Sequence, residues 1–221
     1  MEPMPTNNKG LFITFEGIDG SGKSTQARLL LDRLKSEGRD VVFTREPGGT
    51  GVKISEKIRN VVLNHTSMEM VWKTELLLFM ASRAQHIEEL IAPSLKKGMI
   101  IICDRFADAS VAYQGHARGL DMDWIKKLNL FACGDIWPHK TFLLDISADV
   151  FTERKKKENK SHDRIEKGGA AFQAKVREGY LALAKAEPGR FSCHNGTLPQ
   201  EEIHQQIYSV VQKMLSGSAN S

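Results

Sequence analysis

The chain alternates between short apolar runs and longer stretches in which apolar residues recur every three or four positions. Short apolar runs predict strands that are buried on both faces, and the longer spacing predicts amphipathic helices. The predicted strands cover residues 11–16, 41–46, 99–104, 141–146 and 190–194. The predicted helices cover residues 22–36, 52–63, 73–92, 122–132, 148–156, 168–186 and 199–215.

This order of elements predicts an α/β fold with a mostly parallel sheet that carries helices on both faces. In such sheets ligands bind beyond the carboxyl ends of the strands, so the residues after each strand are the first candidates for a site. The sequence contains no internal repeat and no long linker. We expect one domain over residues 11–215, with a loose N-terminal tail (1–10) and a frayed C-terminal tail (216–221).

The nine residues after the first strand, GIDGSGKST, match the phosphate-binding pattern G-x-x-x-x-G-K-[ST]. Glycines let the backbone turn its N–H groups toward an anion, and the following helix adds its positive N-terminal end. Lys23 is placed to reach the β- and γ-phosphates, and the Ser24 hydroxyl to bind Mg²⁺. A chance glycine-rich turn is the alternative, which the flanking strand and helix disfavour. The predicted ATP-binding residues are Gly17, Ile18, Asp19, Gly20, Ser21, Gly22, Lys23, Ser24 and Thr25.

The ends of the second and third strands carry further candidates. Arg45 precedes a Pro-Gly-Gly turn, and its guanidinium suits a phosphate contact, although a surface arginine is the simpler interpretation. Asp104 closes the third strand, where it is placed to bind Mg²⁺ directly or through water. Arg105 follows and is placed over the phosphates. Asp145, at the end of the fourth strand, is the competing candidate for the metal-associated role, and we favour Asp104 because a cation adjoins it.

The predicted helix over residues 73–92 is more apolar than one core-facing stripe requires, which suggests a second packing partner such as another subunit. Phe79 and Arg83 lie four residues apart on it, so they can sandwich a nucleobase and bind its carbonyl edge. A core phenylalanine beside a solvated arginine is the alternative. Ser110 and Gln114 are also four apart and can present a hydroxyl and an amide to one ligand.

A basic run lies between residues 151 and 166. Such a run is usually a solvated face, but in a phosphoryl-transfer enzyme it can be a lid that brings cations over the phosphates. We place the lid at about residues 154–164. Its cations are Arg154, Lys155, Lys156, Lys157, Lys160 and Arg164.

Composition narrows the classes of function. The 221 residues are 41% hydrophobic and 26% charged, with a net charge of +4, as expected for a globular protein with a real core. This charge suits nucleotides but is too dispersed for a nucleic-acid partner. No stretch has the length and apolarity of a membrane span. The three cysteines (Cys103, Cys133 and Cys193) have neither disulfide-framework nor zinc spacing, which predicts a reducing cytoplasm.

Taken in order, the motifs GIDGSGKST, REPGGTG, FMASRAQH, DRF…AYQG and DRIE resemble a thymidylate kinase of the bacterial type. The resemblance runs from about Leu11 to beyond Glu166. It implies a Mg²⁺-dependent transfer of the γ-phosphoryl of ATP to dTMP, giving dTDP and ADP. It also implies a nucleoside monophosphate kinase fold with a five-stranded parallel sheet, in a cytoplasmic homodimer joined through the 73–92 helix.

The resemblance also assigns roles by position. It implies that Phe79 stacks on thymine, that Arg83 donates to its carbonyl, and that Tyr113 excludes ribonucleotides. Asp19 is similar to the family's acid near the sugar 3′-hydroxyl and the metal. The full dTMP set implied is Asp19, Arg45, Phe79, Arg83, Arg105, Ser110, Tyr113 and Gln114.

Some family members carry a catalytic arginine inside the phosphate loop, and others supply the cation from the lid. This loop has no arginine, which implies a lid-supplied cation, so the catalytic set is Lys23, Arg105 and Arg154. The lid departs from the usual arginine-rich pattern with KKKENK after Arg154, so a lysine there is the alternative donor.

Two rival functions are compatible with parts of this sequence. A deoxynucleoside kinase of related fold would use Glu16 or Asp104 as a general base toward a hydroxyl acceptor. A non-catalytic ATP-binding module would bind nucleotide without turnover, but it leaves the pairing of Phe79 with Arg83 unexplained.

Overall fold

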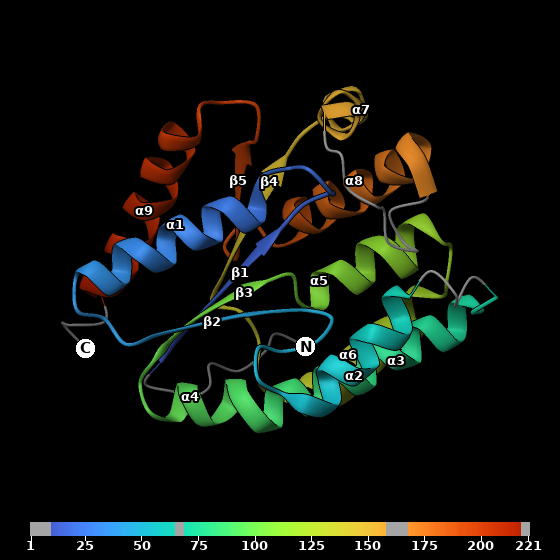
Figure 1. The fold of residues 1–221 in the computed structure, drawn as a ribbon, viewed down its shortest axis with the longest axis horizontal. Helices are drawn as coiled ribbons and strands as arrows, with labels where there is room; N and C mark the ends of the chain where they lie inside the picture. The colour runs from blue at the N-terminus through green and yellow to red at the C-terminus, as the bar shows by residue number, and fades with distance from the viewer. Residues whose placement is uncertain (1–9, 65–68, 158–167, 218–221) are drawn as a thin grey trace.

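The structure, a computed structural model, describes residues 10–64, 69–157 and 168–217. Its centre is a five-stranded parallel sheet in the order β2-β3-β1-β4-β5 (Figure 1). The strands are β1 (Leu11–Glu16), β2 (Val41–Arg45), β3 (Ile100–Asp104), β4 (Lys140–Asp145) and β5 (Phe191–Asn195). This confirms the predicted fold class, and every predicted strand lies within one residue of its observed position.

Helices connect the strands and flank the sheet (Figure 1). They are α1 (Lys23–Ser36), α2 (Lys53–Leu63), α3 (Trp72–His86), α4 (Ala92–Lys96), α5 (Ala107–Ser110), α6 (Met122–Cys133), α7 (Ala148–Lys157), α8 (Gly169–Ala186) and α9 (Gln200–Gly217), with π-helical segments η2 (Ile87–Ile91) and η3 (Val111–Ala117). The helix predicted over 73–92 continues through η2 and α4 to Lys96. The helix predicted to end at residue 215 continues to Gly217.

The alternation of side chains along the strands builds the core on both faces of the sheet. Ile13 and Phe15 of β1 belong to a cluster with apolar residues of α1 and α9. Phe12, which precedes Ile13 and faces the other side of the sheet, belongs to a second cluster with residues of η2, α4 and β3. Buried side chains on both faces explain why the strands are nearly continuous apolar runs.

Strand register brings the candidate residues to one end of the sheet. Asp104 of β3 is paired in register with Phe15 of β1 and with Arg45 of β2. The parallel strands therefore deliver Glu16, Asp104 and Arg45 to the same carboxyl edge, from which the phosphate loop leaves. Helix α3 packs against α2 and α6 beyond this edge (Figure 1). Within the described residues, we find no helix with the length and apolarity needed to cross a membrane.

Candidate active site

The phosphate loop leaves β1 in backbone conformations that favour glycine. Gly17, Gly20 and Gly22 all have positive φ angles. A Cβ on Gly17 would come within 2.5 Å of the carbonyl oxygen of Leu144, so no larger residue fits there. Helix α1 begins directly after Gly22 without a side-chain cap. Its first N–H groups therefore remain directed at the loop, as an anion site requires.

A buried charge cluster lies against this loop. The Asp19 carboxylate accepts hydrogen bonds from Arg105 and, at 2.8 Å, from Gln173 Nε2. Lys23 Nζ lies 3.9 Å from Asp19 Oδ1 and 3.4 Å from the carbonyl oxygen of Ile18. Burial raises the pKa of Asp19, but the charges of Arg105 and Lys23 outweigh it and lower that pKa overall. Asp19 is therefore held as a carboxylate between two cations.

Arg105 reaches the cluster from a strained backbone position. Its φ of 67° makes it the single non-glycine residue with positive φ in the described ranges. The strand-end turn at this angle directs the guanidinium back across the sheet edge, where Nη2 donates to Asp19 and, at 3.1 Å, to the hydroxyl of Tyr113. Strain of this kind persists where the surrounding contacts hold it, and it is frequent at functional sites.

The two aspartates that competed for the metal-associated role have different partners. Ser24 donates a hydrogen bond from its hydroxyl to Asp104 Oδ2. Asp104 Oδ1 is buried and has no hydrogen-bond partner among the described residues. Asp145 instead accepts a two-pronged bond from Arg177, at 2.6 Å and 2.8 Å. Only Asp104 presents an unused carboxylate oxygen beside the phosphate loop.

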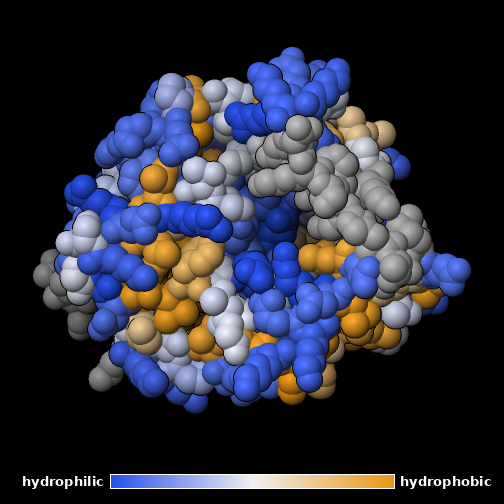
Figure 2. Space-filling model, viewed as in Figure 1, coloured by the Kyte–Doolittle hydropathy of each residue, from blue (hydrophilic) through white to orange (hydrophobic). Residues whose placement is uncertain are grey.

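Beside the cluster lies a cavity of about 150 Å³. Figure 2 shows a recess lined by hydrophilic residues near the middle of the molecular face viewed there. The cavity is lined by residues from the phosphate loop, the turn after β2, α2, α3 and the segment after β3. They are Asp19, Glu46, Pro47, Arg59, Leu63, Phe79, Arg83, Arg105, Phe106, Ala109, Ser110, Tyr113 and Gln114. Seven of the eight predicted dTMP residues are among them, and Arg45 is the exception.

Arg83 is the most constrained member of the cavity wall. Its side chain is 1% exposed, and all five of its N–H groups are directed at acceptors. Nε donates to Glu46 at 2.8 Å, and Nη1 donates to Asn129 at 2.6 Å and to the sulfur of Met80 at 3.6 Å. Nη2 donates to the carbonyl oxygen of Phe106 and to Ser110 Oγ, both at 3.1 Å. The sequence interpretation of a solvated arginine is therefore wrong.

Glu46, which Arg83 contacts, links the cavity to a second buried chain of polar groups. Glu46 Oε1 lies 3.1 Å from His86 Nδ1, and His86 Nε2 lies 2.8 Å from Thr44 Oγ1. Thr50 donates its backbone N–H to the same Thr44 oxygen at 3.1 Å. The turn after β2 is thereby tied to α3.

The two remaining candidate cations lie at opposite sides of the site. Arg45, the last residue of β2, donates from Nη2 to Glu56 Oε2 of α2 at 3.0 Å and lies outside the cavity wall. Arg154 is in α7, where Nη1 donates to the carbonyl oxygen of Gly20 at 2.8 Å and Nη2 to that of Gly196 at 2.7 Å. Arg154 thus contacts the phosphate loop directly. Of the predicted lid, residues 154–157 are in α7 and residues 158–164 lie outside the described residues.

Sequence reasoning missed residues that support this site from behind. Glu16 was considered only for a rival function, yet it accepts hydrogen bonds from Tyr180 at 2.6 Å and from the backbone of Phe106 at 2.7 Å. Burial, followed by the nearby charge of Asp108, raises the pKa of Glu16 to about 8. Gln173 of α8, which positions Asp19, was also missed. The available signal for Gln173 was its place as a polar residue on the apolar face of a predicted helix.

The parallel sheet, the phosphate loop and the adjoining cavity together define a P-loop kinase of the nucleoside monophosphate kinase fold. The sequence model of the family described as thymidylate kinase matches residues 15–207. The chain therefore belongs to the thymidylate kinase family.

Individual proteins agree with this assignment. The thymidylate kinase of Kosmotoga olearia is 48% identical over 197 residues, which cover 89% of this chain and 93% of that protein. That of Pelotomaculum thermopropionicum is 42% identical over 207 residues, covering 94% and 95%. The crystal structure of thymidylate kinase from Ehrlichia chaffeensis superimposes with a TM-score of 0.74 at 36% identity, covering 92% of this chain and 98% of that one.

Proposed function

We propose that this enzyme transfers the γ-phosphoryl group of ATP to dTMP, giving ADP and dTDP. The observation that carries the proposal is that one cavity adjoins the phosphate loop. At one end Phe79, Arg83 and Gln114 offer an aromatic face and hydrogen-bonding groups to a base. At the other end Asp19 and Arg105 connect it to the phosphate loop. A nucleoside monophosphate in this cavity has its phosphate at the loop that holds the donor.

The transfer itself is an in-line displacement. A phosphate oxygen of dTMP forms a bond to the γ-phosphorus as the bond from that phosphorus to the β–γ bridging oxygen breaks. That phosphate oxygen is already ionised near neutral pH, so no general base is required. The protein aligns the two phosphates and offsets their charge, in this proposal with Lys23, Arg105 and Arg154.

The nucleoside is held by the remaining predicted residues. Phe79 supplies the stacking surface, and Arg83, Ser110 and Gln114 supply polar groups toward the base edge. Tyr113, whose ring packs under the Arg105 guanidinium at 5.6 Å, limits the space around the sugar. Arg45, which lies outside the cavity wall, is proposed to contact the dTMP phosphate from the end of β2.

The residues present fit a magnesium ion bound with ATP. Magnesium favours oxygen ligands and is usually held by one or two protein groups together with phosphates. Ser24 and Asp104 are such groups, and the buried Asp104 Oδ1 lacks a partner among the described residues. When bound, the ion neutralises charge that develops on the phosphates.

We further propose a homodimer formed through α3 and its neighbours α2 and α6. Leu77 on α3 is 56% exposed, and Trp124, Leu130 and Phe131 on α6 are 63%, 57% and 86% exposed. Figure 2 shows hydrophobic residues at the surface in the region of these helices. Exposed large apolar residues gathered on adjacent helices are typical of a protein–protein interface. This agrees with the excess apolar character predicted for the 73–92 helix.

The proposal includes a cytoplasmic location. It is supported by the three cysteines, all of which carry free thiols, two of them buried. Proteins of oxidising compartments usually pair their cysteines instead.

A coupled assay of ADP release tests the proposed reaction. It is run with ATP and Mg²⁺ against dTMP, dUMP, thymidine, CMP and AMP in parallel. Turnover on dTMP, with some on dUMP, is expected. Turnover on thymidine alone would replace dTMP with a nucleoside acceptor, and binding of ATP without turnover on any acceptor would contradict catalysis altogether.

A further inference from the structure

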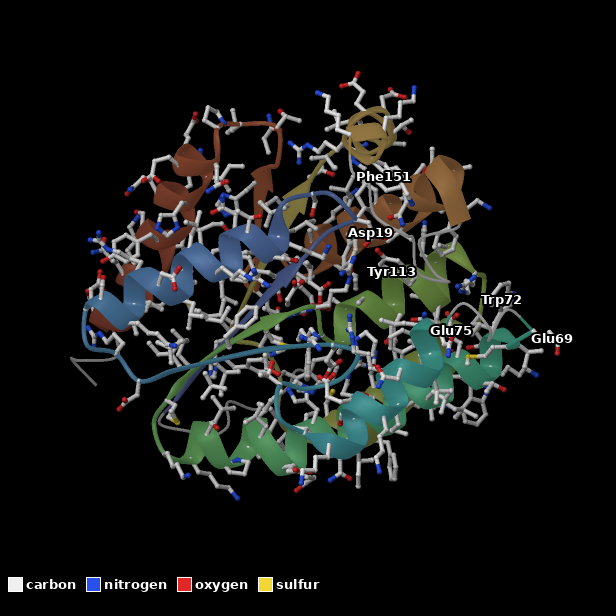
Figure 3. All side chains as sticks on the ribbon, in the orientation of Figure 1. Asp19, Glu69, Trp72, Glu75, Tyr113 and Phe151 are labelled. Carbon is white, nitrogen blue, oxygen red and sulfur yellow. The ribbon has the colours of Figure 1, made fainter. Side chains whose placement is uncertain are left out.

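A buried carboxylate stands directly behind the base end of the cavity. Glu75, in the first turn of α3, is fully buried and does not line the cavity (Figure 3). Its Oε1 accepts a hydrogen bond of 2.8 Å from Gln114 Nε2, and Gln114 does line the cavity. The proposed reaction gives Glu75 no role of its own.

The chemistry of this contact determines how the Gln114 amide is oriented. An ionised carboxylate only accepts hydrogen bonds, so the amide must turn its nitrogen toward Glu75. The amide oxygen of Gln114 then points away from Glu75. Within the described ranges, the one hydrogen bond of the Gln114 side chain is the bond to Glu75. The oxygen is therefore available as an acceptor on the cavity side.

A second set of contacts holds Glu75 in place. Arg118 donates from Nε to Glu75 Oε1 at 2.8 Å and from Nη2 to Oε2 at 3.0 Å. The Arg118 guanidinium lies 3.8 Å from the centre of the Trp72 ring and 5.0 Å from that of Phe172. A two-pronged ion pair stacked on aromatic rings fixes the position of the carboxylate. Figure 3 shows Trp72 and Glu75 together at the start of α3.

We propose that Glu75 is a positioning residue that sets base selectivity. By fixing the Gln114 amide, it makes the cavity present an acceptor to position 3 of a pyrimidine and excludes cytosine. The inference rests on the proposed function, because it takes dTMP to be the acceptor.

The hydrogen-bonding edges of the two bases show why one orientation matters. Thymine and uracil carry a donor at N3 and an acceptor at O4. These match the Gln114 oxygen and the N–H groups of Arg83. Cytosine carries an acceptor at N3 and a donor at its amino group, so it opposes both. A site built to satisfy one pattern rejects the other because buried polar groups are left unpaired.

The Glu75→Gln variant tests the proposal. A glutamine at this position can donate to Gln114 as well as accept from it, so it no longer dictates which end of the amide faces the cavity. We expect the ratio of kcat/KM for dTMP to that for dCMP to fall by about tenfold or more. The change is expected mainly as a rise in KM for dTMP, together with a gain in kcat/KM for dCMP.

A double variant, Glu75→Gln with Gln114→Glu, reverses the same hydrogen bond. The amide of residue 75 then donates to a carboxylate at 114, whose other oxygen presents an acceptor to the base. We expect this exchange to recover most of the preference for dTMP. A purely structural role for Glu75 does not predict such a recovery.

Matched variants separate selectivity from stability. Asp108→Asn breaks another buried carboxylate–arginine pair, with Arg190, without touching Gln114, and it should keep the substrate ratio. If Glu75→Gln folds poorly, Glu75→Asp keeps the charge but withdraws the carboxylate, and it should lower the ratio to a smaller extent.

The two possible failures are distinguishable. Wild-type enzyme without dTMP turnover would overturn the proposed function. Wild-type turnover on dTMP, with the dTMP-to-dCMP ratio unchanged in the Glu75 variants, would overturn only the role of Glu75.

Discussion

Arg154 and Gly20 join helix α7 to the phosphate loop, through a hydrogen bond of 2.8 Å from Arg154 Nη1 to the Gly20 carbonyl oxygen. The carbonyl is a neutral acceptor, and a phosphate oxygen is a charged and stronger one. In the proposed reaction, this bond keeps the guanidinium beside the donor phosphates, without an ion pair to another described residue. It brings an arginine to a loop that has none, from a position 134 residues later in the chain.

Replacement of Arg154 should therefore affect the chemical step more than acceptor binding. We expect Arg154→Ala to lower kcat by about 100-fold, with KM for dTMP nearly unchanged. The reason is that one fixed cation no longer offsets the charge that develops on the phosphates in the transition state. Arg154→Lys should recover only part of this loss, since lysine lacks the planar fork. Steady-state kinetics with both substrates measure the effect.

Lys157→Ala is the matched control, since Lys157 is an exposed cation at the end of the same helix. An equal loss of activity in the control would show that the catalytic charge comes from the basic run as a whole and not from Arg154 in particular.

Asp104 should determine the dependence on magnesium. In Asp104→Asn the carboxylate oxygen that lacks a partner becomes part of a neutral amide, a poorer magnesium ligand. We expect the Mg²⁺ concentration for half-maximal activity to rise about tenfold or more. Titration of activity with MgCl₂ at fixed ATP measures the change.

Asp145→Asn provides the comparison. Asp145 is paired with Arg177, so its replacement should alter stability without changing the magnesium requirement. The opposite pattern, with magnesium dependence altered only at residue 145, would transfer the metal-associated role to Asp145.

Buried Glu16 should make stability depend on pH. Its pKa is raised to about 8 by burial and by Asp108, while the unfolded chain has the ordinary value of 4.5. Between these values the folded state holds a proton that the unfolded state has released, so stability falls as pH rises. This contribution is fully present below about pH 4.5 and is lost as pH rises through 8. The slope is at most about 1.4 kcal/mol per pH unit.

The Glu16→Gln variant removes this titration while keeping an acceptor for Tyr180. We expect the Tm of wild type, relative to the variant, to decline from pH 5 to pH 9 by roughly 2–4 °C per kcal/mol lost. Thermal melts across this range measure the difference. Parallel curves for the two proteins would show that Glu16 keeps an ordinary pKa in the folded state.

The exposed apolar residues of α3 and α6 should control assembly. We expect Leu77→Glu combined with Phe131→Glu to convert a dimer to a monomer, because two charges would be buried without partners in the interface. Sedimentation velocity measures the mass. Leu181→Glu, an equally simple charge insertion at a 36% exposed leucine on α8, should leave the assembly intact. A wild-type monomer at all concentrations would contradict the proposed dimer.

Local patterns were sufficient for the sheet and for the residues that follow its strands. The apolar runs located all five strands, and their carboxyl ends located Lys23, Asp104 and Arg105. The segment over 107–117 was recognised only by the spacing of Ser110 and Gln114. Its helix was not predicted, because ADASVAYQGHA combines small, polar and glycine residues without a continuous apolar stripe.

Partners distant in the chain could not be predicted. Asp104 and Asp145 each end a buried strand, and the sequence favoured Asp104 only because Arg105 adjoins it. The pairing of Asp145 with Arg177 distinguishes them, and it depends on where α8 crosses the sheet. The burial of Arg83 has the same origin, since Asn129 and Glu46 reach it from separate elements.

Every N–H group of Arg83 already has an acceptor in the protein, and this affects how the cavity can bind a base. A thymine carbonyl can gain a hydrogen bond from this guanidinium only by taking a share of one that Ser110 or Phe106 already accepts. The exchange leaves the number of hydrogen bonds nearly constant, so its contribution to affinity is small. A base with an amino group at that position, however, brings a donor against N–H groups that already have acceptors, so its own donor stays unpaired. Arg83 therefore contributes more to selectivity for the base than to affinity for it.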